Sequence, residues 1–322
     1  MEQQEQMDML LSRLQSAEIA YRVQESMARH TTFAIGGAAK CFVSPQNEEQ
    51  LIQALCYARE FAVPYVVLGR GSNVLFSDDG FCGMVLSTLG LKGISSASED
   101  TERPKITAEC GVSLRELALY AARQGWEGLA FAHGIPGTLG GAVRMNAGAF
   151  EGSIGALIDE VRCYCPATDR VEVLSGEALK FSYRHSFLTD RPDLVCLSAT
   201  LSLVRPGEDA ALVQQRIYQT MEDMRQRRRT TQPLEFPSAG SVFKRPQGHY
   251  AGKLIEDCHL KGKSVGGAQV SEKHAGFIIN RGGATAQDVR DLIRLIQRQV
   301  QDTYNVALEE EIVYIGDDAG SE

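Results

Sequence analysis

The chain has 322 residues, of which 43% are hydrophobic and 23% are charged, a composition typical of folded globular proteins. Its formal net charge of −8 argues against nucleic-acid binding through a basic surface, and no apolar run is long enough to predict a membrane span. The eight cysteines include no CxxC pair and the six histidines show no metal-binding spacing, so neither a disulfide framework nor a metal site is predicted. The polar N-terminus does not resemble a signal peptide, and we expect a cytoplasmic protein with reduced cysteines.

Short helices and strands alternate along the first part of the chain. Apolar residues at helical spacing predict a leading helix. A second helix follows a short strand, with Ser44 as its N-cap and Pro45 as its first helical residue. The predicted elements cover residues 7–20 (helix), 39–43 (strand), 46–62 (helix), 64–68 (strand) and 69–80 (glycine-rich loop).

The loop at 69–80 begins with Gly69-x-Gly71 directly after a strand, as a dinucleotide-binding turn does. The third glycine of that pattern would fall on Val74, and no helical pattern follows, so a Rossmann unit is not predicted. Two interpretations stay open for this loop. It is either a phosphate-binding loop or a glycine-rich connection within a hairpin.

The middle of the chain predicts more strands than helices. Ser113 and Glu116 have the spacing of a capping box and open a helix over residues 114–124. Short helices among many short strands favour an α+β fold with two lobes over a doubly wound sheet. Strands are expected at 74–76, 84–87, 106–109, 160–166, 171–174 and 194–204, with 160–166 and 171–174 forming a hairpin.

Residues 133–150 form the densest run of small residues, with five glycines and three alanines. Within it, Thr138 begins a short helical segment whose N-terminal amides we expect to be bare, which would suit an anionic group such as a phosphate. A tight turn in a well-packed β-rich domain is the structural alternative. Because Arg144 and Asn146 follow at once, we favour contact with a ligand.

The last third of the chain is predicted to begin after a boundary near residues 205–207. The helix over 209–229 ends in a cluster of arginines. This cluster either places favourable positive charge at a helix C-terminus or neutralises a diphosphate. A final amphipathic helix begins at Thr285, which Asp288 caps three residues on.

Three further features could carry chemistry. Arg184, between aromatic and hydroxyl side chains, is either a surface charge or a clamp for a carboxylate. Ser241 lacks the GxSxG context of a serine hydrolase. In the closing strand 311–315, alternation would turn Glu309 and Glu311 to one face, so that one of them can point into a pocket while the middle glutamate is solvated.

Taken together, these motifs resemble the UDP-N-acetylenolpyruvoylglucosamine reductases, a family of bacterial cell-wall flavoenzymes. The resemblance runs from about His30 to Gly316, and it is specific because several motifs occur in the right order. They are His30-Thr-Thr-Phe-Ala-Ile-Gly-Gly, Leu68-Gly-Arg-Gly-Ser-Asn-Val-Leu, Gly134-Ile-Pro-Gly-Thr-Leu-Gly-Gly, Met145-Asn-Ala-Gly-Ala-Phe, Tyr183-Arg-His-Ser, Ala239-Gly-Ser-Val-Phe-Lys and Leu308-Glu-Glu-Glu-Ile.

The resemblance implies an α+β fold with a two-subdomain FAD-binding region of the vanillyl-alcohol-oxidase (PCMH) type and a smaller α+β substrate domain. We expect an N-terminal helix and connector at 1–29, the FAD-binding domain at 30–205 and the substrate-binding domain at 206–318. The implied activity is the NADPH-dependent reduction of UDP-N-acetylglucosamine enolpyruvate to UDP-N-acetylmuramate through bound FAD, in peptidoglycan precursor synthesis. We expect a monomer that binds neither nucleic acid nor membrane.

Both glycine loops would then hold the pyrophosphate of FAD. Some flavoenzymes of this fold attach FAD covalently through a histidine near the first loop, but here the loop reads Arg70-Gly-Ser-Asn, so we expect noncovalent FAD. The residues expected to bind the cofactor are Gly69, Arg70, Gly71, Ser72, Asn73, Gly134, Ile135, Pro136, Gly137, Thr138, Gly140, Gly141, Asn146, Ala147 and Gly148.

The resemblance also implies roles for three catalytic residues. Arg184 would contact the enolpyruvyl carboxylate, Ser241 would protonate the α-carbon, and Glu311 would be the acid group opposite the serine. The implied reaction moves a hydride from NADPH to flavin N5 and then to the terminal carbon of the enol ether. Negative charge then builds on the α-carbon and carboxylate, where a fixed arginine and an acidic partner lower the barrier.

Substrate contacts are implied at Tyr183, Arg228, Lys244 and Gln269. The span from Arg184 to Ser241 is too short for the mobile tyrosine-bearing loop of some members, so the chain resembles the subgroup without it. We therefore expect Arg228 to contact the diphosphate. Lys244 is followed by arginine where some members have asparagine. The alternatives are another FAD-dependent oxidoreductase of the same fold, or a noncatalytic sensor that binds a flavin or sugar nucleotide.

Overall fold

The structure, a computed structural model, describes residues 3–98 and 102–316 and divides into two compact units. The first unit comprises Met1–Arg22, Phe42–Gly69 and Gly83–Arg227, and the second comprises Val23–Cys41, Arg70–Cys82 and Arg228–Glu322. The chain passes between the units five times, so neither unit is a continuous stretch of sequence. No helix in the described part of the chain is long and apolar enough to cross a membrane.

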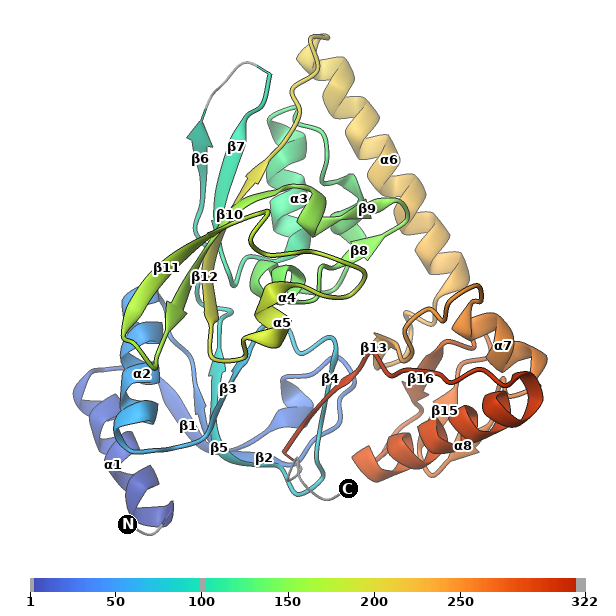
Figure 1. Cartoon of the computed structure of the whole chain (residues 1–322), viewed down its shortest axis with the longest axis horizontal. Helices are drawn as coiled ribbons and strands as arrows, with labels where there is room; N and C mark the ends of the chain where they lie inside the picture. Colours follow the sequence, from blue (N-terminus) through green and yellow to red (C-terminus); the bar gives the residue numbers. More distant parts are fainter. Residues whose placement is uncertain (1–2, 99–101, 317–322) are drawn as a thin grey trace. The chain divides into compact units, whose positions relative to one another are not determined.

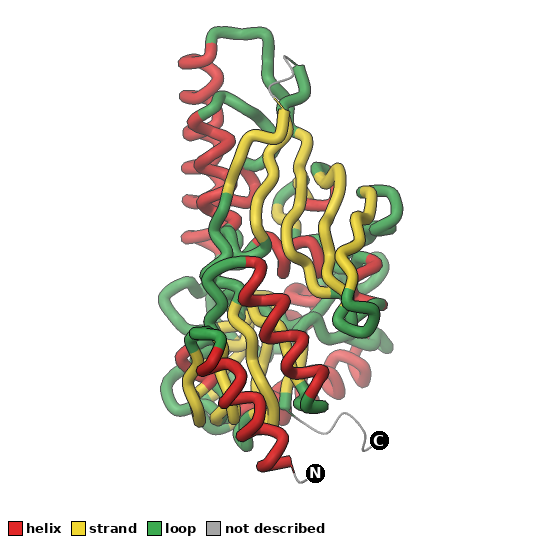
Figure 2. The backbone as a smooth tube through the Cα atoms, turned by 90° about the vertical axis from the view of Figure 1, so that its left-hand side faces the viewer, coloured by secondary structure: helices red, strands yellow, loops and turns green. Residues whose placement is uncertain are grey.

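A five-stranded sheet forms the centre of the first unit, in the order β11-β10-β12-β7-β6 (Figures 1 and 2). Its strands are β6 (Ile94–Ser98), β7 (Lys105–Glu109), β10 (Ile158–Cys165), β11 (Arg170–Ser175) and β12 (Val195–Ser202). All four neighbouring pairs are antiparallel. The predicted hairpin is β10–β11, in which Tyr164 opposes Val171.

Helices contribute apolar residues to the same hydrophobic core as this sheet. They are α3 (Leu114–Arg123), α4 (Leu139–Arg144), α5 (Phe187–Asp190) and the first part of α6 (Ala210–Thr231). The predicted capping box of Ser113 and Glu116 is present at the start of α3. The residues that α6 buries, Val213, Ile217 and Met221, are four apart and form one stripe. Short pieces complete the unit: η2 (Ala130–Gly134), β8 (Gly148–Ala149), β9 (Gly152–Ser153) and η3 (Ile154–Ala156).

Two further helices of the first unit, α1 (Gln3–Ser16) and α2 (Glu48–Glu60), lie side by side (Figure 2). Helix α1 begins and ends four residues earlier than the predicted 7–20. It ends at Ser16 because Glu18 adopts a left-handed φ of 54° and the amide of Ile19 turns back to the carbonyl of Leu14. The N-cap of α2 is Asn47, not the predicted Ser44, because the Asn47 side chain accepts a hydrogen bond from the amide of Gln50.

A four-stranded sheet with the order β1-β2-β5-β3 contains three of the points at which the chain passes from one unit to the other. Its strands are β1 (Tyr21–Ser26), β2 (Ala38–Val43), β3 (Tyr65–Leu68) and β5 (Phe81–Ser87). Strands β3 and β5 run parallel, with Tyr65 opposite Met84.

The second unit contains a sheet in the order β13-β16-β15-β14, which packs against α8, and α7 packs against α8. Its elements are η1 (Met27–Arg29), β4 (Val74–Phe76), β13 (Ser238–Ser241), α7 (Ala251–Asp257), β14 (Ser264–Val265), β15 (Ala268–Val270), β16 (Phe277–Asn280), α8 (Ala286–Tyr304) and β17 (Val313–Ile315). The core of this unit combines Phe33, Ile35 and Leu75 with the apolar face of α8.

Helix α8 follows the prediction closely. Thr285 and Asp288 form its capping box, and the helix buries one apolar face, which consists of Ala286, Val289, Leu292, Ile293, Ile296 and Val300. The closing strand differs from the prediction, because β17 begins only at Val313 and pairs in parallel with β4. Glu309 and Glu311 therefore precede the strand, and strand alternation does not place them on one face.

Candidate functional site

The two predicted glycine loops meet within the first unit. A Cβ atom on Gly69 would overlap the side-chain oxygen of Thr138, so the loops approach each other at a distance that only glycine allows. Thr138 is buried and is the N-cap residue of α4. The structure thus brings together the start of the first loop and the helical start of the second.

The N-terminus of α4 is partly occupied by the protein itself. The amides of Leu139 and Gly140 donate to the carbonyls of Val112 and Cys110, both at 2.8 Å. The expectation of bare amides is therefore wrong for these two residues. Gly141 differs, because it is exposed and a Cβ there would meet no atom closer than 3.8 Å. The missing side chain of Gly141 leaves open surface, which fits the close approach of a cofactor phosphate.

The rest of the second loop is held by backbone contacts. The amide of Leu114 donates to the carbonyl of Gly137, and the amide of Ala147 donates to the carbonyl of Ala142. Gly134 ends η2, Ile135 is its C-cap, Pro136 is exposed and Gly148 lies in β8. Asn146 is buried, and its side chain bonds within the protein.

Residues 70–73, by contrast, belong to the second unit. The carbonyl of Gly71 accepts from the amide of Thr32 at 3.0 Å, which ties this loop to the segment that begins at His30. Asn73 donates its side-chain amide to the carbonyl of Glu311 at 2.9 Å. Arg70 is exposed and Ser72 is half-buried.

Arg184 lies in a tight turn of the first unit. Ser182 and His185 pair across it, with N–H···O distances of 3.0 and 3.3 Å, and Tyr183 and Arg184 are the two residues between them. Arg184 has a left-handed φ of 55°, and its Nη1 donates to the carbonyl of Gly148 at 3.3 Å. Its guanidinium also lies 5.2 Å from the ring centre of Tyr183, whose side chain is exposed. The turn therefore presents two predicted substrate contacts together.

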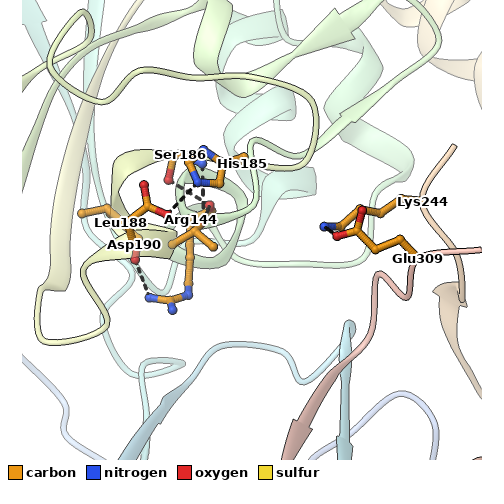
Figure 3. A network of polar contacts seen from close by, with 8 residues as sticks. Arg144, His185, Ser186, Leu188, Asp190, Lys244 and Glu309 are labelled. Atoms are coloured by element: carbon orange, nitrogen blue, oxygen red, sulfur yellow. Dashed lines mark hydrogen bonds and ion pairs between the residues drawn. The ribbon is translucent and has the colours of Figure 1, made fainter. Parts of the chain in front are cut away.

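Hydrogen bonds to Arg144 hold the segment that follows this turn (Figure 3). The Ser186 and Thr189 hydroxyls donate to the carbonyl of Arg144 at 2.8 and 2.9 Å. Nη1 of Arg144 donates to the carbonyl of Leu188 at 2.8 Å. Burial lowers the pKa of Arg144, and no carboxylate among the described residues pairs with it.

Ser241 and Glu311 lie on adjoining segments of the second unit. The amide of Glu311 donates to the carbonyl of Val242 at 2.8 Å, so the two predicted catalytic residues are held by neighbouring backbone. Gly240 has a φ of 81°, and a Cβ there would meet nothing within 4 Å. The backbone beside Ser241 is therefore open on that side, at the irregularity that separates Ser238 from Ser241 in β13.

His274 lies close to Ser241, although no spacing in the sequence pointed to it. A Cβ on Gly276 would lie 3.0 Å from Cε1 of His274 and 3.5 Å from Oγ of Ser241. Nδ1 of His274 accepts from the amide of Gly276 at 3.1 Å, so Nε2 carries the proton of the neutral ring. Burial lowers the pKa of His274, which favours this neutral form.

The run of three glutamates divides into three environments. Glu309 is exposed and forms an ion pair with Lys244 (Figure 3). The middle residue, Glu310, is not solvated as expected, because it accepts hydrogen bonds from Gln297 at 3.2 Å and from the Tyr314 hydroxyl. Burial and the Glu310 carboxylate raise the pKa of Tyr314. Glu311 is half-buried, as Glu310 is, and its proposed role stays a prediction.

The remaining predicted substrate residues differ in what already binds them. Gln269 donates to the carbonyl of Gly262 and the hydroxyl of Ser264, at 3.0 and 3.1 Å. Arg228 is half-buried without a carboxylate partner in the described chain, and burial lowers its pKa. Arg225, three residues earlier, is exposed and paired with Glu222.

The site contains no metal cluster: no group of three or more metal-ligating side chains occurs within residues 3–98 and 102–316. All eight cysteines are described and are thiols. Burial raises the pKa of Cys110 and Cys163 to about 12, so these two thiols are unreactive near neutral pH.

Comparison with known proteins gives a consistent result. A family model described as the C-terminal domain of UDP-N-acetylenolpyruvoylglucosamine reductase matches residues 232–315, and a model described as an FAD binding domain matches residues 39–174. The chain is 43% identical over 295 residues to a UDP-N-acetylenolpyruvoylglucosamine reductase of Caldanaerobacter subterraneus subsp. tengcongensis, covering 92% of this chain and 93% of that protein. The chain is also 43% identical over 296 residues to a UDP-N-acetylenolpyruvoylglucosamine reductase of Clostridium perfringens, covering 92% of this chain and 93% of that protein.

A solved structure shows the same similarity. The crystal structure of UDP-N-acetylenolpyruvylglucosamine reductase from Thermus caldophilus matches with a TM-score of 0.72 and 32% identity, covering 92% of this chain and 98% of that one. These matches confirm the predicted α+β class, with an FAD-binding region followed by a smaller α+β domain.

Proposed function

Because the chain belongs to the UDP-N-acetylenolpyruvoylglucosamine reductase family, we propose that it uses NADPH to reduce UDP-N-acetylglucosamine enolpyruvate to UDP-N-acetylmuramate. It is an FAD-dependent oxidoreductase. The turn at Tyr183-Arg184 is the main support for this substrate. It presents a guanidinium beside the carbonyl of Gly148, in the glycine-rich stretch. We propose that the protein acts as a cytoplasmic monomer in peptidoglycan precursor synthesis.

The loops around Gly69, Thr138 and Gly141 would hold the FAD pyrophosphate. Support comes from the open surface at Gly141 and from the close approach of Gly69 to Thr138. The chemistry that bound FAD supplies is hydride transfer from the nicotinamide to the terminal carbon of the enolpyruvyl ether. Because the loop at Arg70 has no histidine, the cofactor would be held without a covalent bond.

Arg184 would bind the substrate carboxylate. Negative charge grows on that carboxylate and on the neighbouring α-carbon as the hydride adds, and a guanidinium can donate two parallel hydrogen bonds to a carboxylate. A charge that is fixed before the reaction stabilises the transition state more than a mobile one, because no reorientation is needed. The left-handed turn at Arg184 supports this role, since it restricts where the side chain starts.

Ser241 would give its proton to the α-carbon. A serine hydroxyl is a weak acid in water, but a positioned hydroxyl can protonate a strongly basic carbon. Glu311, held through the carbonyl of Val242, would be the acid group opposite the serine. The open backbone at Gly240 leaves room for a substrate beside Ser241.

Arg228 would neutralise the UDP diphosphate. A half-buried guanidinium without a carboxylate partner is costly, and an anionic ligand offsets that cost when it binds. Lys244 already has Glu309 as a partner and Gln269 already has two acceptors, so these two residues would contact the substrate only by exchanging partners.

The two half-reactions test this function directly. Wild type and Ser241→Ala are reduced with NADPH under anaerobic conditions, the enolpyruvyl UDP-sugar is added, and the flavin absorbance is followed. We expect wild type to be bleached and then reoxidised, while Ser241→Ala is bleached normally and reoxidised about 10²- to 10⁴-fold more slowly. If the UDP-sugar does not reoxidise the reduced wild type, the proposed substrate is wrong and another FAD-dependent oxidoreductase remains.

Steady-state kinetics distinguish an enzyme from the remaining alternative, a noncatalytic sensor. A noncatalytic sensor would bind the flavin or the sugar nucleotide without turnover. NADPH oxidation that continues beyond one equivalent of flavin, and that depends on the UDP-sugar, excludes a sensor.

A further inference from the structure

Arg184 adopts a backbone conformation that needs external support. A left-handed φ of 55° costs a residue with a Cβ about 1 to 2 kcal/mol. The pairing of Ser182 with His185 closes the turn but does not fix where it lies on the rest of the unit. The contacts that anchor the turn therefore decide where the guanidinium begins.

Asn146 anchors the turn on its N-terminal side. Its side chain is buried, and Nδ2 donates to the carbonyl of Ser182 at 2.7 Å. Oδ1 accepts from the amide of Gly155 at 2.9 Å. One partner is an acceptor and the other a donor, so together they set the orientation of the side-chain amide. Asn146 itself has a φ of 44°, which asparagine tolerates better than most residues.

Arg144 anchors the same turn on its C-terminal side (Figure 3). Its carbonyl accepts the hydroxyls of Ser186 and Thr189, and its guanidinium donates to the carbonyl of Leu188. The Arg144 side chain thus donates to a backbone carbonyl, and it forms no ion pair with a carboxylate among the described residues. Residues 144–146 hold the chain both before and after Arg184.

We propose that Asn146 and Arg144 are positioning residues for Arg184, an inference that rests on the carboxylate-binding role proposed above. Both lie in the same stretch as Gly141, which is expected to contact FAD. One continuous segment would then support the cofactor and the arginine that binds the substrate carboxylate. A change at Asn146 should therefore slow the step that needs Arg184, the reoxidation by substrate, more than it slows the reduction by NADPH.

The first test uses Asn146→Asp, with Asn146→Gly beside it. Aspartate keeps an acceptor for the amide of Gly155 but places a carboxylate oxygen against the carbonyl of Ser182, while glycine removes both bonds and keeps the left-handed backbone. Because Asn146 is among the residues expected to bind FAD, flavin content and the rate of reduction by NADPH are measured for both variants, and the effect on reoxidation is expressed relative to the effect on reduction. Reoxidation by the UDP-sugar should slow about 10- to 100-fold, because misplacement of a binding group by about 1 Å has an effect of this size.

A double-mutant cycle tests whether the effect passes through Arg184. Arg184→Gly removes the guanidinium and still permits the left-handed turn. In that background Asn146→Asp should have little further effect on reoxidation. An equal slowing of reoxidation in both backgrounds would overturn the positioning role, because it would show that Asn146 acts by another route.

Hydrogen exchange provides a readout that does not depend on activity. Asn146→Asp should speed amide exchange at residues 183–188, and the matched control Asn305→Asp, at another left-handed asparagine, should not. If Asn146→Asp is too unstable, Arg144→Met tests the other anchor by the same exchange and reoxidation measurements. Unchanged exchange and unchanged reoxidation contradict the proposal. A third outcome separates the two proposals. If the UDP-sugar does not reoxidise the wild type but Asn146→Asp still speeds exchange at these residues, the proposed function is wrong and the structural role of Asn146 stands.

Discussion

At the scale of single residues, the arginines of this protein differ in whether the chain neutralises them. Arg225 is exposed and paired with Glu222, whereas the guanidinium of Arg228 is half-buried and has no carboxylate partner in the described chain. Burial without a partner destabilises a protein, so such a charge is retained where an anion can bind. This contrast identifies Arg228, rather than Arg225, as the candidate for the diphosphate contact, which its sequence position alone does not do.

We predict that Arg228→Met raises the KM for the UDP-sugar about 10- to 100-fold, because a charge-assisted hydrogen bond contributes about 1.5 to 3 kcal/mol. The thermal midpoint without ligand should stay the same or rise, since a buried unpaired charge is removed. Arg225→Met is the control and should leave KM within about twofold. A loss of stability in Arg228→Met without a change in KM would identify the residue as structural.

His274 is predicted to make stability depend on pH. Burial lowers its pKa in the folded protein below the ordinary value of 6.5, so the unfolded chain takes up the proton first as the pH falls. The stability contributed by the neutral ring is complete above pH 6.5 and is lost as the pH falls from there toward the folded pKa. Calorimetry between pH 7.5 and 5.5 should show a steeper fall of the thermal midpoint in wild type than in His274→Asn. Equal slopes would contradict this assignment.

At the scale of elements, the N-terminus of α8 is held by two separate parts of the second unit. Thr285 and Asp288 form the local capping box, and the Asp78 carboxylate from the loop after β4 accepts the amides of Ala286 and Gln287 at 2.8 and 3.1 Å. A negative charge at this end also interacts favourably with the helix dipole. The contact joins residues that are 208 positions apart, so it fastens the loop to the helix.

We predict that Asp78→Ala lowers the free energy of unfolding by about 1 to 2 kcal/mol, the usual effect of losing a helix cap. Its neighbour Asp79 is also exposed, but the two α8 amides bond to Asp78, and Asp79 donates its own backbone amide to the Ser77 hydroxyl. Asp79→Ala is therefore the matched control, expected within about 0.5 kcal/mol of wild type. Denaturant unfolding of both variants measures the difference, and equal effects would show that the cap does not stabilise α8.

At the scale of the whole molecule, each unit has its own hydrophobic core, and the segments that carry the expected FAD-binding residues occur in both. A ligand that binds only the folded protein raises its stability, by about 2.7 kcal/mol at a concentration of 100 Kd. Removal of FAD should therefore destabilise the protein as a whole.

We predict that acid precipitation gives a colourless pellet and a yellow supernatant, since no histidine in the first loop can carry a covalent flavin. The protein without FAD should unfold at a lower temperature, and added FAD should restore the midpoint. A yellow pellet after washing would show covalent attachment. An unchanged midpoint would mean that FAD does not bind the folded state selectively.

Local patterns predicted the elements whose signals are local. The apolar spacing of α8 and the capping boxes at Ser113 and Thr285 depend on residues within a few positions of one another, and the structure confirms them. Element ends were harder to predict. Glu18 ends α1 early through a left-handed φ, and Asn47 caps α2 in place of Ser44.

The candidate site was predicted mainly through ordered motifs, and its supporting contacts were not. Asn146 bonds to Ser182 across 36 positions, and nothing in either local sequence marks the pair. Glu310 was expected in solvent because charged runs usually are, but Gln297 and Tyr314 bind it. Such contacts depend on tertiary packing, which a single sequence does not display.

The division of each unit among distant stretches of sequence has a consequence during synthesis on the ribosome. Thr32 donates its hydroxyl to the carbonyl of Ser238, and Phe33 is buried in the core that α8 completes. At about 5 to 20 residues per second, about 10 to 50 seconds separate the emergence of these partners. The nascent chain would expose Phe33 and Ile35 throughout that interval. Chaperones could bind these two residues then, whereas the folded protein buries both.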